Sequence, residues 1–82
     1  MKIYIVKNYS IADGCVELDT VDAFVSEEDA KKYFDKCVTE SQKCVKDFGW
    51  EEEWIDDYYC VNEKGNFSQN REEVELITTT LQ

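Results

Sequence analysis

Residues 26–49 read SEEDAKKYFDKCVTESQKCVKDFG, and this stretch decides the fold. Its apolar side chains recur every three or four residues, which places them on one face of a helix. Ser26 occupies the N-cap position, and three acidic residues follow it where the helix dipole favours negative charge. Gly49 suits the left-handed C′ position. The stretch predicts one amphipathic helix of about 22 residues, roughly 33 Å long.

The chain on both sides of this helix is rich in β-branched and aromatic residues, which is typical of β-strands. Strands are expected at 2–9, 15–25, 56–62 and 74–81. The first has apolar side chains on both faces and is expected inside the sheet. In the second, a phase shift of the apolar alternation predicts a bulge between Asp19 and Asp22. Asp13-Gly14 and the segment 63–66 predict turns.

The order β-β-α-β-β predicts an α+β fold, with a four-stranded antiparallel sheet and one long helix packed on one face. A chain of 82 residues is expected to form a single domain, 1–82. No second helix is predicted to cover the other face of the sheet. That face is therefore expected to be solvated or to bind something.

The composition argues against catalysis. Histidine is absent, so the usual general base and the commonest metal ligand are both missing. With three glycines in the chain, there is no glycine-rich phosphate loop, and no Gly-x-Ser-x-Gly turn occurs. We therefore expect neither an enzyme nor a bound cofactor. A carboxylate-metal hydrolase that uses Glu53 and Asp57 is the weaker alternative.

Four cysteines are present, and no pair has Cys-x-x-Cys spacing: Cys15, Cys37, Cys44 and Cys60. Small buried apolar residues are the favoured interpretation, with a disulfide framework and a four-thiolate metal site as alternatives. Lys7 and Asn8 interrupt the N-terminal apolar run, so no secretion signal is expected. No apolar stretch approaches the roughly 18 residues of a membrane span. The expected location is the cytoplasm.

The net charge of −10 is unevenly distributed along the chain. Residues 1–50 hold ten acidic and seven basic side chains, a sum of −3, whereas residues 51–82 hold nine and two, a sum of −7. Five carboxylates lie between Glu51 and Asp57, and aromatic residues interleave and flank them. One interpretation is a solvated loop whose tryptophans pack into the core. The other is a binding surface, because aromatic residues dominate interface hot spots and carboxylates attract cationic partners.

On the second interpretation, the partner-binding residues are Glu51, Glu52, Glu53, Trp54, Asp56, Asp57 and Tyr58. The segment from Trp50 to Tyr59, with the small size and acidity of the chain, resembles phage-encoded inhibitors of the anti-CRISPR and DNA-mimic type. The resemblance implies binding to a nuclease effector complex at its nucleic-acid site. A rigid acidic surface can occupy a Lys/Arg groove that otherwise binds phosphate.

The leading prediction is thus a non-enzymatic acidic protein that binds a basic partner protein. Direct binding to nucleic acid or to a membrane is not expected at this charge. A homodimer is a second prediction, since an exposed edge strand or the uncovered sheet face could pair with another copy. Such a protein would be a structural or assembly domain of a mobile element.

Overall fold

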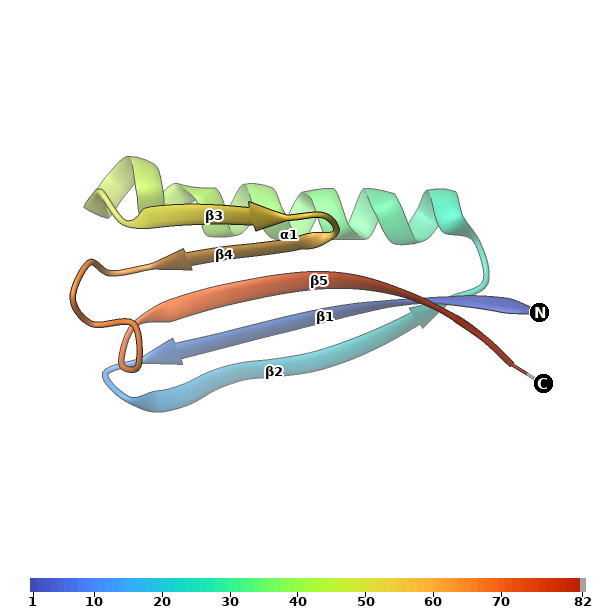
Figure 1. Ribbon diagram of the computed structural model, residues 1–82, viewed down its shortest axis with the longest axis horizontal. Helices are drawn as coiled ribbons and strands as arrows, with labels where there is room; N and C mark the ends of the chain where they lie inside the picture. Colours follow the sequence, from blue (N-terminus) through green and yellow to red (C-terminus); the bar gives the residue numbers. More distant parts are fainter. Residues whose placement is uncertain (82) are drawn as a thin grey trace.

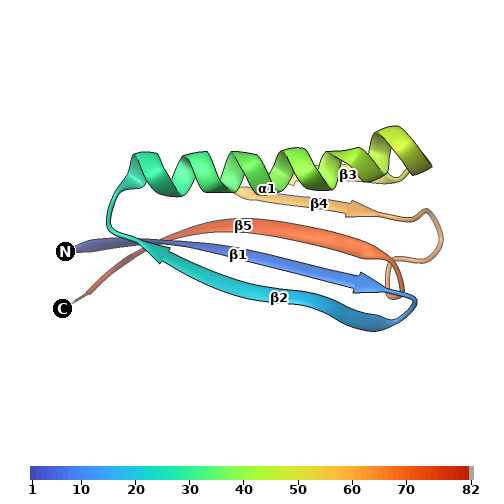
Figure 2. The ribbon, with the colours of Figure 1, turned by 180° about the vertical axis from the view of Figure 1, so that it is seen from behind.

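The computed structural model describes residues 1–81 and shows one helix on a five-stranded antiparallel sheet. The elements are β1 (Lys2–Ala12), β2 (Cys15–Phe24), α1 (Glu27–Phe48), β3 (Glu51–Ile55), β4 (Tyr58–Asn62) and β5 (Arg71–Thr80). The spatial order of the strands is β2-β1-β5-β4-β3, and α1 runs along the length of the sheet (Figures 1 and 2). The predicted α+β class is confirmed.

The predicted number of four strands is wrong, because the acidic segment itself forms a strand. β3 pairs antiparallel with β4 from Glu51 opposite Asn62 to Ile55 opposite Tyr58. The strand predicted at 56–62 therefore starts at Tyr58, and residues 56–57 form the turn. Consecutive glutamates have a low strand propensity, but pairing with a central strand outweighs that local preference.

The predicted helix is confirmed at both ends. The backbone N–H of Asp29 donates to Ser26 Oγ at 3.2 Å, and Gly49 has a φ of 70°. The N–H of Gly49 donates to the carbonyl of Val45 at 3.0 Å, which satisfies a free carbonyl of the last turn. Among residues 1–81, no helix has the length and apolarity that crossing a bilayer requires.

The core lies between α1 and one face of the sheet. Its sheet side includes four side chains with almost no solvent exposure: Val6, Tyr59, Val61 and Val74. Its helix side consists of most of the predicted apolar stripe: Ala30, Phe34, Cys37, Val38 and Cys44. Phe48, the last apolar residue of the stripe, is exposed instead. The helix is thus held by one apolar face, as its sequence pattern predicts.

All four cysteines are free thiols. Three are buried, as predicted, but Cys15 is exposed because it is the first residue of β2, next to a turn. Burial and the neighbouring Glu72 raise the pKa of Cys44 to about 11, so its thiol is protonated at neutral pH.

The first strand lies inside the sheet as predicted, between β2 and β5. The Asp13-Gly14 turn is also confirmed, with φ values of 51° and 78°. The predicted position of the bulge is wrong. Ser10 pairs with Leu18 and Ile11 pairs with Val16, which leaves residue 17 as the extra one. The pairing continues without a shift through 19–22, where the apolar side chains of β2 change face while the backbone stays regular.

Candidate protein-interaction surface

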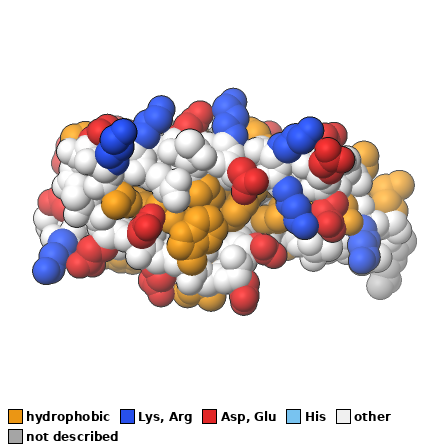
Figure 3. Space-filling view, turned by 90° about the horizontal axis from the view of Figure 1, so that it is seen from above, with side chains coloured by type: hydrophobic (Ala, Val, Ile, Leu, Met, Phe, Trp, Pro, Cys, Tyr) orange, Lys and Arg blue, Asp and Glu red, His pale blue; other side chains and the backbone are white. Residues whose placement is uncertain are grey.

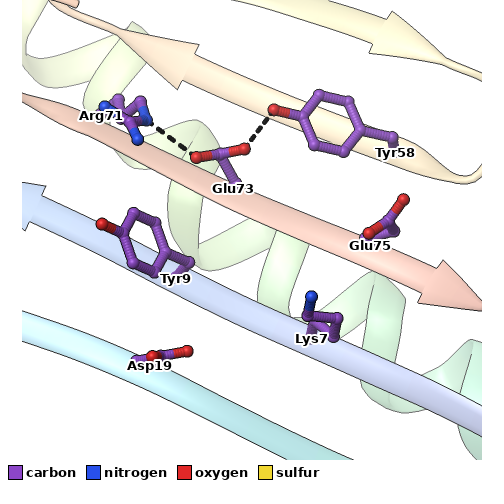
Figure 4. Close-up of a pocket in the computed structure, with 7 residues that line it drawn as sticks. All are labelled: Lys7, Tyr9, Asp19, Tyr58, Arg71, Glu73 and Glu75. Carbon is purple, nitrogen blue, oxygen red and sulfur yellow. Dashed lines mark hydrogen bonds and ion pairs between the residues drawn. The ribbon is translucent and has the colours of Figure 1, made fainter. Parts of the chain in front are cut away.

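The face of the sheet opposite α1 is not covered by any other element of residues 1–81 (Figures 1 and 2). We call it the open face. Its centre is a shallow depression of about 360 Å³ lined by Lys7, Tyr9, Asp19, Tyr58, Arg71, Glu73 and Glu75 (Figure 4). These side chains come from four neighbouring strands, and the strand register brings them together. Because side chains alternate along a strand, the buried neighbours of these residues face α1.

Glu73 is the centre of a polar network on the open face (Figure 4). Its carboxylate accepts hydrogen bonds from the Tyr58 hydroxyl and, at 2.8 Å, from Arg71 Nε. Burial opposes ionisation of Glu73, but the bonds from Tyr58 and Arg71 outweigh it and lower the pKa of this carboxyl. Burial and the bond to Glu73 raise the pKa of Tyr58. At neutral pH the network therefore contains an anionic Glu73 and a neutral Tyr58.

Arg71 also stacks on aromatic rings. Its guanidinium carbon lies 5.4 Å from the ring centroid of Tyr9 and 4.8 Å from that of Phe67. Both distances allow a cation–π attraction, which with the ion pair to Glu73 holds the arginine against the sheet. The charge of Arg71 is consequently engaged within the protein.

The open face has more carboxylates than cations. Alternation and register place Glu51 and Glu53 on it, with Glu53 opposite Cys60 and Cys60 opposite Glu73. Its carboxylates are Asp19, Glu51, Glu53, Glu73 and Glu75, and its cations are Lys7 and Arg71. Two minus five gives a charge of −3 on this face. The open face can therefore attract a cationic surface.

The seven predicted partner-binding residues all lie on the hairpin of β3 and β4, but they do not form one face. Glu51, Glu53 and Tyr58 are on the open face, whereas Glu52 and Trp54 are on the face that carries α1. Asp56 and Asp57 form the turn at the end of the hairpin. Six of the seven residues are exposed, and Tyr58 is partly buried.

Trp54 is both a packing residue and a surface residue. Its ring centroid lies 4.5 Å from that of Tyr59 and 6.4 Å from that of Phe34, yet half of the residue is exposed. Beside it, the carboxylate of Glu52 accepts the Tyr59 hydroxyl at 2.6 Å. Trp50 is partly buried and packs against the core. Both tryptophans therefore pack against the core, and Trp54 in addition presents apolar surface to solvent. Figure 3, which views this side of the molecule, shows an apolar area among charged side chains.

Sequence reasoning missed the open-face residues outside the hairpin: Lys7, Tyr9, Asp19, Arg71, Glu73 and Glu75. They come from strands at both ends of the chain, and the registers of β1 with β5 and of β1 with β2 bring them together. The two-residue spacing of Lys7 and Tyr9, and of Arg71, Glu73 and Glu75, was a usable signal. It shows polar side chains on one face of each strand.

Within residues 1–81, no group of three or more Asp, Glu, Cys or His side chains is close enough to hold a metal ion. Glu53, named for the hydrolase alternative, lies on the open face, and its proposed companion Asp57 lies in the turn. No family model, no curated protein and no solved structure matches this chain. Function therefore has to be inferred from the chain's own residues.

Proposed function

We propose that this protein is a non-enzymatic binding protein whose acidic surface engages a basic site on a partner protein. The observation that carries the proposal is the separation of charge between the helix and the rest of the molecule. α1 contains five lysines and six carboxylates, a sum of −1. The remainder of the chain contains four cations and thirteen carboxylates, a sum of −9. The acidic character thus belongs to the sheet, its hairpins and its connecting loops.

The open face and the β3–β4 hairpin suit such a partner for a second reason. Their backbone is held in paired strands, so the carboxylates are presented in a fixed arrangement before binding. Tyr9, Tyr58 and Trp54 supply aromatic surface beside them, and aromatic side chains provide much of the energy of protein interfaces.

A basic site that normally binds nucleic acid has the charge that this surface complements. The resemblance to anti-CRISPR and DNA-mimic proteins implies a nuclease effector complex as the partner. Binding would then block the access of nucleic acid to that site, and no catalytic step would be required.

The test is capture of partners from a host-cell lysate by the immobilised chain, followed by titration of the purified partner. Neutralising Glu51→Gln with Glu53→Gln should weaken binding about three- to tenfold at low salt. Asp35→Asn with Glu40→Gln removes the same charge from the exposed surface of α1, and this matched control should have little effect. The proposal would be refuted if the affinity for the partner changed neither with the salt concentration nor with the Glu51→Gln and Glu53→Gln substitutions.

A homo-oligomeric assembly domain is the second candidate, and the other edge of the sheet favours it. β2 is an outer strand, and Val16 and Val21 on it are more than half exposed. Antiparallel pairing of two β2 strands would join two sheets. Light scattering should then show a dimer, and a strict monomer at millimolar concentration would exclude it.

A further inference from the structure

On the premise of the proposed function, we infer that β3 takes up an extended basic segment of the partner as a sixth strand of the sheet. The segment would alternate cationic and apolar side chains. This mode is β-strand addition, in which main-chain hydrogen bonds provide affinity and alternate side chains provide specificity.

β3 has the free edge that strand addition requires. It pairs with β4 on one side, and within residues 1–81 no strand lies on its other side (Figure 1). All five of its residues are exposed. In an antiparallel ladder, the N–H and C=O groups of alternate residues point away from the paired neighbour. Those of β3 consequently remain available to an incoming strand.

The side chains of β3 define what such a strand would carry. Glu51 and Glu53 lie on the open face, and neither forms an ion pair with a cation of residues 1–81. Lysine or arginine side chains on that side of the added strand would supply the missing opposite charges.

The side of β3 that faces α1 has different requirements. The carboxylate of Glu52 is already bonded to the Tyr59 hydroxyl, and the half-exposed ring of Trp54 rests against Tyr59 and Phe34. An apolar side chain of the added strand would cover this ring and remove apolar area from water. The two sides together call for alternation of cationic and apolar residues.

The other outer strand is less suited to this role. β2 is interrupted by the bulge at Glu17, and a bulge bends a strand and disrupts its ladder. β3 pairs regularly over its whole length and contacts α1 through Trp54 and Phe34, so an added strand would have a neighbour on that side. Self-pairing of β3 is disfavoured, because it would bring the glutamates of two copies together.

The decisive probe is an octapeptide of alternating lysine and valine, titrated against the full chain at low salt. Its control is the same peptide with every backbone nitrogen methylated, which keeps the charge and side chains but cannot donate hydrogen bonds. Strand addition predicts at least about tenfold weaker binding of the methylated peptide, because several main-chain hydrogen bonds are lost. It also predicts that hydrogen exchange slows at the amides of β3 and not at those of β2.

Equal affinity of the two peptides would overturn strand addition and leave the acidic-surface function standing. If amide hydrogen exchange slowed in β2 instead of β3, the assignment of β3 as the edge that takes up the strand would be overturned. Failure of the unmodified peptide to bind at low salt would overturn strand addition at β3. The acidic-surface function is tested separately, by the response of partner binding to salt and to the Glu51→Gln with Glu53→Gln variant.

A charge reversal provides the matched test on the protein. Glu51→Lys with Glu53→Lys should weaken binding of the unmodified peptide at least about tenfold. Asp35→Lys with Glu40→Lys makes the same change in net charge on α1 and should have a much smaller effect. Far-ultraviolet circular dichroism checks that both variants fold. An equal loss of peptide affinity in the two double variants would show a general attraction by net charge, and it would refute docking at β3.

Discussion

The two faces of the sheet are built from the same strands but are stabilised in different ways. The face beneath α1 buries apolar side chains such as Val6 and Val74, which have almost no exposure. On the opposite face, the same two strands present Lys7 and Glu73, and partly buried groups are joined there by hydrogen bonds and stacking. The difference shows that one face provides the hydrophobic free energy of folding, while the other remains open to solvent.

The largest effect is expected for Phe34→Ala, on the covered face. Phe34 is buried in α1 and touches the ring of Trp54. Its truncation should lower the free energy of unfolding by about 3–5 kcal/mol, because a cavity replaces a packed ring. Urea denaturation measures the change. A loss below about 1 kcal/mol would mean that the covered face is not the core of the fold.

A smaller effect is expected for Glu73→Gln on the open face. The substitution removes a carboxylate that accepts from Tyr58 and Arg71, and it should cost about 2 kcal/mol at pH 7. The folded-state pKa of Glu73 is lowered, so its stabilisation is present above the ordinary glutamate range and is lost as the pH falls through the folded-state value. Urea denaturation should therefore show a difference at pH 7 that shrinks as the pH falls below the ordinary glutamate range. A difference independent of pH would contradict the charged network.

Removing the N-cap tests the stability of α1, the helix that covers one face of the sheet and leaves the other uncovered. Ser26→Ala leaves the N–H of Asp29 without its side-chain acceptor and should destabilise the protein by about 1 kcal/mol. Thermal unfolding followed at the helical circular dichroism band measures the loss. Ser26→Asp is the control and should restore most of the stability, since aspartate is also a good N-cap.

The smallest effect is expected for Val21→Thr, on the open face of β2. Val21 is 61% exposed, so its replacement should change the stability by no more than about 0.5 kcal/mol. Unfolding is measured at two protein concentrations. A larger loss that depends on concentration would show that Val21 is buried between two copies, which would favour the assembly-domain alternative.

The helix was predictable because its signals are local. Ser26 and Gly49 each form their capping interactions within a few residues of the helix ends, and the apolar stripe follows from the helical repeat itself. β3 was not predictable in the same way. A run of glutamates has no strand preference of its own, and it becomes a strand because β4 is available to pair with it. The bulge was misplaced because apolar alternation reports which face is buried and not where the backbone is irregular.

The candidate site was predictable in part. Glu51, Glu53 and Tyr58 could be singled out, because acidic and aromatic residues crowd one segment. The distribution of the segment's residues over two faces of the sheet could not be predicted, because it depends on the residue at which β3 begins. Glu73 and Tyr9 escaped notice, because they are 64 residues apart in the sequence and become neighbours only through the register of β1 with β5.

The sequence by itself determined the length and ends of the helix, its buried stripe and the concentration of negative charge after Gly49. These properties depend on residues close together in the sequence, because capping, helical periodicity and local charge are set within a few turns of the chain. The tertiary structure alone decided that the acidic segment is an edge strand, that Trp54 is half covered, and that Arg71 neutralises Glu73. Each of these depends on contacts between distant segments, because strand pairing and burial are set by the whole sheet.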